Sequence, residues 1–284
     1  MMRSRRPRSH SVDEENPYWV SFSDIMAGLL VVFILASVVL ILQVIEEQAV
    51  LEKKQTEVEE TREELKKAKT RYERTKSHLQ EALAQLKKAE EVRRTVVEEL
   101  VQKLAERGID VRVSENASVV SIPNELLGFG SGRDEILPRY QDTARDIGRV
   151  LYEVVSHGDR FRYLDTVFIE GHTDPRPFDG AQCAGKGNWC LSTFRAISLW
   201  RFWEDALPGN SQLDELRNPD GKPLFSVSGY ADSRPPESLN AALGQEELTG
   251  EQLAQFRRIN IRFTVSRPES EEVETFAEER DESQ

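Results

Sequence analysis

One carboxylate, Asp24, lies inside the most apolar stretch of the chain and is the only charged residue between Tyr18 and Gln43. From Ile25 to Leu42 every residue is apolar or small, and Gly28 and Ser37 are the least apolar of them. A run of this length suits a helix that crosses a hydrocarbon core of ~30 Å. An ionised carboxylate in that core costs about 2.5–3.5 kcal/mol or more, so it is protonated or faces a partner or a wet path. The pattern therefore predicts that Asp24 carries a proton or another ion.

Two other interpretations of this segment stay open. Asp24 is near the start of the run and is simply hydrated if it lies at the membrane interface. Tyr18 and Trp19 are typical of the interfacial aromatic belt, which would place Asp24 about one helical turn deeper. The arginine-rich start also fits a signal peptide, but the apolar run is longer than an h-region and no small-x-small cleavage site follows it.

We therefore expect a retained transmembrane helix at 18–45. Arginines precede it and acidic residues follow it, which predicts a cytoplasmic N-terminus at 1–17 and an external remainder.

Two cysteines, Cys183 and Cys190, lie in one loop and are the only ones in the chain. In an oxidising compartment such a pair is a candidate disulfide that closes a short loop. Zinc is the alternative, but the spacing is not CxxC and His172 is the only extra ligand nearby. We expect no metal and no cofactor.

The 284-residue chain has a net charge of −12, and part of this acidity lies in the tail at 268–284, which we expect to be disordered. The external region has no basic stretch of the kind that binds nucleic acid, so we expect no nucleic-acid partner.

Residues 46–107 contain neither proline nor glycine and are rich in strong helix formers. Apolar residues recur every seven positions, at Leu51, Val58, Leu65, Tyr72, Leu79 and Leu86. This pattern favours a parallel coiled-coil spacer and hence a homodimer, with a reach of about 90 Å at 1.5 Å per residue. Arg93 breaks the series, which predicts a stutter or a change of packing there. The alternative is a single solvated helix with many i, i+4 ion pairs.

Residues 108–267 alternate strand and helix patterns, which predicts an α/β sandwich with helices on one face of a sheet. Gly108 is expected to end the spacer helix, Ser192 to cap one later helix and Thr249 another. The expected strands are 111–113, 119–122, 164–170, 225–229 and 259–265, and the expected long helices are 139–155 and 191–207.

Two polar motifs stand out in this domain: IEGHTD at 169–174, which closes a strand, and NWCLSTFRA at 188–196, which opens a helix. Asp174 and Arg195 either form a structural ion pair across this junction or bind a charged ligand, and the residues alone leave both interpretations open. The motifs resemble the GHTD and NxxLSxxRA signatures of OmpA-like peptidoglycan-binding domains. FGSG at 129–132 and RRINI at 257–261 also fit that family, and the resemblance covers about 110–266.

This resemblance implies that Asp174 receives the ammonium of diaminopimelate in a peptidoglycan stem peptide, and that Arg195 binds its carboxylate through a bidentate fork. Asn188 and the backbone near Thr173 would hold the remaining polar groups. The loop that carries both cysteines is longer than in a minimal OmpA-like domain and looks like that of the MotB subgroup.

The anchor sequence WVSFSDIMA at 19–27 resembles the tryptophan–aromatic–Asp–x–Met motif of MotB-type stator subunits. This resemblance implies that Asp24 carries the coupling ion, H⁺ or Na⁺, in a complex of the homodimer with a pentameric, multi-span MotA- or ZorA-like channel subunit. An Asp-bearing helix, a long spacer and a wall-binding domain together look like the ZorB subunits of Zorya anti-phage systems. The flagellar version has a short plug after its helix and fits less well.

Three functions follow as hypotheses. The chain is an ion-driven motor subunit of the bacterial inner membrane with a periplasmic, peptidoglycan-bound domain, in anti-phage defence or alternatively in flagellar motility. It is a passive wall-anchored scaffold. Or it is a peptidoglycan hydrolase that uses His172 and Asp174. A lone His–Asp pair lacks the third member of a catalytic set, so we expect that the chain is not an enzyme.

Overall fold

The computed structural model describes residues 17–236, 238–239 and 248–267. It divides into two compact units, Met1–Lys76 and Ser77–Gln284. The N-terminal arginines and the acidic tail at 268–284 lie outside the described residues, so the predictions for them stay predictions.

The first helix, α1, runs without interruption over Pro17–Ala105 and contains Asp24. Among the described residues it is the one helix long and apolar enough to cross a membrane. The large apolar side chains of its first part are exposed, as Leu30 and Phe33 illustrate. A helical segment that is apolar all round and that the described residues leave uncovered is suited to lipid or to partner helices.

The heptad residues of α1 are exposed as well. The leucine at the centre of the series, Leu65, has 68% of its surface exposed, and the apolar residues one heptad away on either side, Val58 and Tyr72, are similar. Among the described residues this stripe packs against no partner, so the coiled-coil dimer remains a prediction.

The packing of α1 changes near Arg93, as its sequence predicts. Val96, Val97, Leu100 and Leu104 are fully buried in the core of the second unit, and Val101 is partly buried against it. Lys103 forms an ion pair with Glu153 of the domain. Gly108 has a φ of +72° and ends the helix, and the N–H of Ile109 donates back to the Leu104 carbonyl at 2.9 Å, as in a Schellman motif.

The domain contains one five-stranded sheet in the order β1-β2-β5-β3-β4. Its strands are β1 (Arg112–Val113), β2 (Val119–Pro123), β3 (Leu164–His172), β4 (Phe225–Gly229) and β5 (Arg258–Val265). Only the β3–β4 pair is parallel, so the chain crosses over the sheet between them through a helix.

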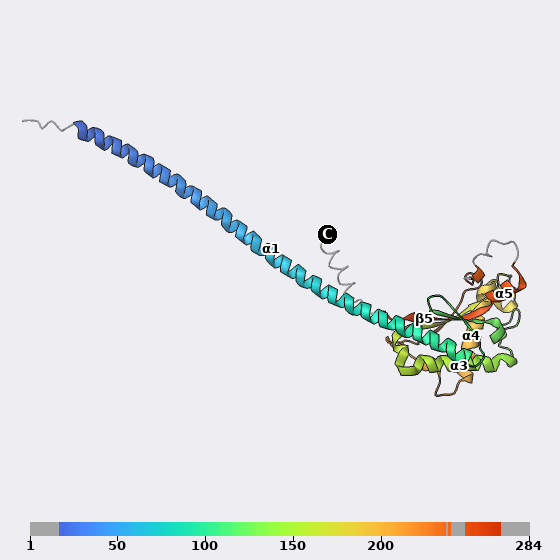
Figure 1. Cartoon of the computed structure of the whole chain (residues 1–284). Coiled ribbons are helices and arrows are strands. Elements are labelled where there is room, and N and C mark those ends of the chain that lie inside the picture. Colours follow the sequence, from blue (N-terminus) through green and yellow to red (C-terminus); the bar gives the residue numbers. More distant parts are fainter. Residues whose placement is uncertain (1–16, 237, 240–247, 268–284) are drawn as a thin grey trace, which may run out of the picture. The chain divides into compact units, whose positions relative to one another are not determined.

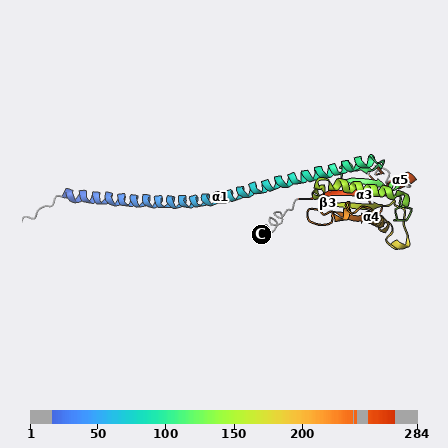
Figure 2. The same cartoon turned by 90° about the horizontal axis from the view of Figure 1, so that it is seen from below.

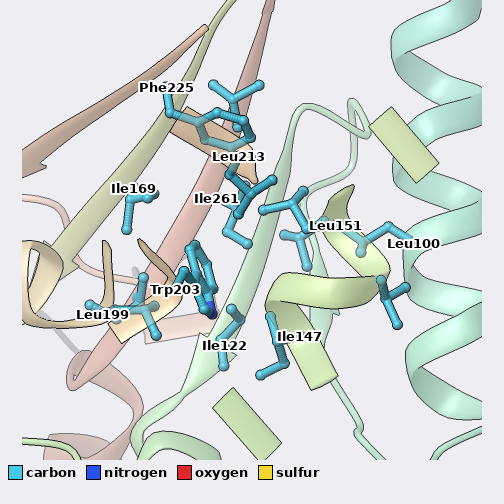
Figure 3. Close-up of a cluster of buried hydrophobic side chains, with 14 of the residues drawn as sticks. Leu100, Ile122, Ile147, Leu151, Ile169, Leu199, Trp203, Leu213, Phe225 and Ile261 are labelled. Carbon is cyan, nitrogen blue, oxygen red and sulfur yellow. The ribbon is translucent and has the colours of Figure 1, made fainter. Parts of the chain in front are cut away.

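Helices α3 (Gln141–Ser156) and α4 (Gly187–Ala206) pack with the last turns of α1 against one face of this sheet (Figures 1 and 2). The short helices are α2 (Asn124–Leu127) and α5 (Gly250–Phe256). Figure 3 shows how side chains from the sheet and all three long helices meet in one core. At its centre the Trp203 ring lies against Gly148, and its Nε1 donates to the Ala144 carbonyl at 2.7 Å. The predicted α/β sandwich is thereby confirmed.

Most predicted elements are observed with shifts of a few residues at their ends. Thr249 caps α5 through a capping box with Gln252, as expected. The prediction that Ser192 caps a helix is wrong, because α4 begins earlier, at Gly187. The Ser192 hydroxyl instead accepts a hydrogen bond from the Ala231 N–H at 3.0 Å and so ties α4 to the turn after β4.

Candidate ligand-binding site

The two polar motifs meet where β3 ends and α4 begins. Gly171 permits this close approach, because a Cβ at that position would collide with the carbonyl oxygen of Ser192. Beyond the strand, the Thr173 N–H donates to the Ala231 carbonyl at 2.9 Å. The backbone is therefore fixed on both sides of the residues that face the site.

Asp174 is buried, with 7% of its surface exposed, and both of its carboxylate oxygens are engaged. Oδ1 accepts from the backbone N–H and the Nε of Arg176 at 3.1 and 3.0 Å. Oδ2 accepts from Nη2 of Arg176 at 2.9 Å and from Nη1 of Arg257 at 2.8 Å. Burial opposes ionisation of Asp174, but these hydrogen bonds outweigh it and hold its pKa below the usual value. Asp174 is therefore an anion at neutral pH.

Arg195 is buried beneath the loop at 129–133. Its Nε donates to the Arg133 carbonyl at 2.9 Å, and its Nη2 donates to the Gly130 carbonyl at 3.0 Å. Burial first, and then repulsion from Arg257, lower the pKa of Arg195 to about 10, so the guanidinium stays charged at neutral pH. The alternative of a direct Asp174–Arg195 ion pair is wrong, since the structure gives each side chain other partners.

Thr173 and Asn188 differ in whether their side chains already form hydrogen bonds within the domain. The Thr173 hydroxyl is buried and has no hydrogen-bond partner among the described residues, and an unsatisfied buried group of this kind calls for an explanation such as a ligand. The Asn188 amide already donates to the carbonyls of Asp174 at 3.1 Å and Arg176 at 2.9 Å. Asn188 thus holds the loop in place.

A single pocket of about 430 Å³ brings together all four predicted binding residues, Thr173, Asp174, Asn188 and Arg195. It is also lined by the loop after α2, at 129–132. Three guanidinium groups face one carboxylate in this pocket, since Arg176 and Arg257 line it as well. Such a site suits a ligand that carries carboxylates together with an ammonium group.

The structure joins Cys183 to Cys190 in a disulfide with a Cα–Cα distance of 5.6 Å. Both sulfur atoms are used in this bond, so the zinc alternative does not apply to them. The bond closes the loop that leads into α4, and Asn188 and the exposed Trp189 lie within it. It therefore restrains one wall of the pocket.

His172 does not pair with Asp174. Its ring is buried on the opposite face of the sheet, where Nε2 lies 3.1 Å from the Asn260 Nδ2 and the ring stacks on Tyr230. Burial, and then the charges of nearby arginines, lower the pKa of His172 to about 2. A neutral, enclosed imidazole that lacks an aspartate partner is not a general base for hydrolysis.

The sequence reasoning missed Arg176 and Arg257. Arg176 follows Asp174 by two residues, and a neighbouring charge of opposite sign was a usable signal. Arg257 lies 83 positions away from Asp174 in the chain and reaches it only through the pairing of β5 with β3.

Comparison with known proteins gives no matching family model and no matching curated protein. Among solved structures, a putative MotB-like protein from Desulfovibrio vulgaris is 17% identical, with 65% of this chain and 98% of that chain covered and a TM-score of 0.43. The cell wall anchor of the T6SS from Pseudomonas aeruginosa is 20% identical, with coverage of 59% and 97% and a TM-score of 0.40. The periplasmic domain of Helicobacter pylori MotB (residues 90-256) is 15% identical, with coverage of 63% and 93% and a TM-score of 0.42. Likeness at this level leaves the function to be argued from the site's own residues.

Proposed function

We propose that this chain is an inner-membrane subunit of an ion-driven motor and that its second unit binds peptidoglycan. The observation that carries the wall-binding part is the pocket in which Asp174 and Arg195 lie together beside the unsatisfied hydroxyl of Thr173. Its arrangement supports binding of a zwitterionic residue and not hydrolysis.

Diaminopimelate in a stem peptide presents the groups that this pocket can receive. Its ammonium would bind Asp174 in place of Arg176, whose side chain is the most exposed of the partners. Its carboxylate would bind Arg195 and Arg257. Because Nε and one N–H of Nη2 of Arg195 already hold the loop, the carboxylate would meet the Nη1–Nη2 edge of the guanidinium.

Co-sedimentation of the full chain with purified peptidoglycan tests this proposal. Asp174→Asn removes the charge that receives the ammonium and should release most of the protein into the supernatant. Asp179→Asn is the matched control, because Asp179 is an exposed carboxylate of the same loop. Equal retention of both variants would contradict binding through this pocket.

The motor part of the proposal is supported by Asp24, which is the only charge between Tyr18 and Gln43, in the apolar part of α1 whose large side chains are exposed. Asp24 would be protonated against the apolar surface of a pentameric, MotA- or ZorA-like channel subunit and ionised when it faces a hydrated path, with H⁺ or Na⁺ as the coupling ion. A homodimer through the heptad stripe would place two such helices in that channel, and the wall-bound domains would hold them still in the periplasm.

Asp24→Asn should leave insertion and assembly with the channel partner intact but abolish activity, whereas Asp24→Glu should retain part of it. We place this activity in anti-phage defence of the Zorya type, so phage plating is the expected readout, and a swimming assay tests the flagellar alternative. Full activity of Asp24→Asn would leave a passive scaffold as the function.

A further inference from the structure

The face of the sheet that points away from α3 and α4 carries a groove of about 620 Å³. Its lining runs along β2 and β5 and is completed by the turn after β1 and the segment that follows β4. Four arginines line it, namely Arg112, Arg234, Arg258 and Arg262. We call this feature the arginine groove. It goes beyond the proposed function, because the wall-binding pocket lies elsewhere in the domain and shares none of its lining residues.

One buried carboxylate, Glu170, offsets part of this charge. Arg262 binds it through two hydrogen bonds of 2.7 and 2.8 Å, and Nη1 of Arg234 lies 3.8 Å from it. An adjoining hollow, which Arg112 and Arg258 also line, carries Glu125 and Glu251. Within the groove itself, four guanidinium groups face one carboxylate, so the groove carries a net positive charge.

Arg234, Arg258 and Arg262 are also held in place. Arg258 donates to the carbonyls of Arg234 at 2.7 Å and Phe256 at 3.1 Å. The guanidinium of Arg234 lies 3.7 Å from the centre of the Tyr230 ring. Fixed cations lose little side-chain entropy when an anion binds, which favours binding.

We propose that the arginine groove binds the acidic C-terminal segment of this same chain, residues 268–284. From 269 onward this segment reads ESEEVETFAEERDESQ, with eight carboxylates and one arginine. It begins three residues after Val265, the last residue of β5, and β5 supplies Arg258 and Arg262 to the groove. Charge complementarity and attachment to the groove's own strand are the two observations that select it.

The chain is long enough to make this contact. Returning along β5 from residue 267 to Arg258 covers nine residues, or about 30 Å, whereas 17 extended residues span about 55 Å. A short tether also gives the segment an effective concentration of about millimolar order at the groove, which compensates for weak individual ion pairs.

The test uses the full chain in detergent, a version that ends at residue 267, and a fluorescent peptide of residues 268–284. We expect the shortened chain to bind the peptide, and the full chain to bind it at least about fivefold more weakly because its own tail competes. Arg112→Glu in the shortened chain should weaken peptide binding about fivefold, since it replaces attraction by repulsion. Arg112 is chosen because it is exposed, whereas loss of Arg262 would remove the two hydrogen bonds that hold the buried Glu170. Arg201→Glu, at an exposed arginine of α4, is the matched control and should bind normally.

Four results would overturn the proposal. One is equal peptide binding by the full and the shortened chain, and another is equal binding by the Arg112 and Arg201 variants. The third is a shortened chain that binds polyphosphate or anionic vesicles but does not bind the peptide. Competition that disappears on dilution of the full chain would assign the tail to a second copy and contradict docking within one chain. Retention on peptidoglycan should be unchanged in Arg112→Glu, which separates this test from that of the wall-binding pocket.

Discussion

The burial of His172 predicts that acid destabilises the domain well above the pH at which carboxylates titrate. His172 is 1% exposed, and its pKa is lowered to about 2 by burial first and then by Arg258, Arg234 and Arg262. In the unfolded chain an imidazole has a pKa of about 6.5. Between these values the His172 imidazole is protonated in the unfolded chain and neutral in the folded chain. The free energy of unfolding therefore falls as the pH falls through 6.5.

The size of this effect follows from the same linkage. Lowering the pH from 7 to 5 should remove about 2 kcal/mol from the free energy of unfolding, and any folded pKa below about 4 gives the same figure. Asp174 and Glu99 also have lowered pKa values. Because carboxylates of this kind lose their contribution only as the pH falls below about 4–5, they add little in this window.

Urea unfolding of the full chain in detergent, followed by tryptophan fluorescence at pH 7 and pH 5, measures this loss. His172→Gln should remove most of the pH dependence, while His157→Gln, at an exposed histidine, should keep it. If the His172 variant does not fold, the imidazole resonances of the native chain give the same information. A His172 ring that takes up a proton near pH 6.5 in the folded chain would refute the reasoning.

Three further predictions concern the pocket, the loop and the spacer. Arg176→Ala should tighten binding of a diaminopimelate muropeptide about two- to fivefold in calorimetry, because it removes an exposed competitor for the ammonium site; weaker binding would show that Arg176 contributes to the ligand site. Reduction of the Cys183–Cys190 bond should lower the free energy of unfolding by about 2.4 kcal/mol for a loop of this size, measured by urea unfolding with and without reductant; no change would contradict a structural role. Leu65→Gln should shift the chain from dimer to monomer in sedimentation, while Lys67→Gln, off the stripe, should not; a dimer in both would reject the coiled coil.

Local patterns predicted most of the fold. Short apolar runs in the sequence predicted the strands, and the change of spacing near Arg93 marked where α1 begins to pack on the domain. Ser192 was misread as a cap because a serine near a helix start has several uses, and its actual partner, the Ala231 N–H, is 39 residues away. Such a contact exists only once β4 is paired with β3.

The sequence predicted which residues line the candidate site but not which residues form hydrogen bonds with one another there. Motif resemblance selected Thr173, Asp174, Asn188 and Arg195, and all of them line one pocket. The partners of Asp174 were not foreseen, because Arg257 reaches it across the sheet. Partner choice among several arginines depends on three-dimensional distances that spacing along the chain does not encode.

The most direct test of the central claim compares the full chain on two kinds of peptidoglycan. Diaminopimelate differs from lysine at the same stem position by one carboxylate, the group assigned to Arg195 and Arg257. The account predicts retention on diaminopimelate-type peptidoglycan and at least about tenfold weaker retention on the lysine type, since a site built for a charged group rejects a ligand that lacks it. Equal retention on both would contradict the assignment of the pocket.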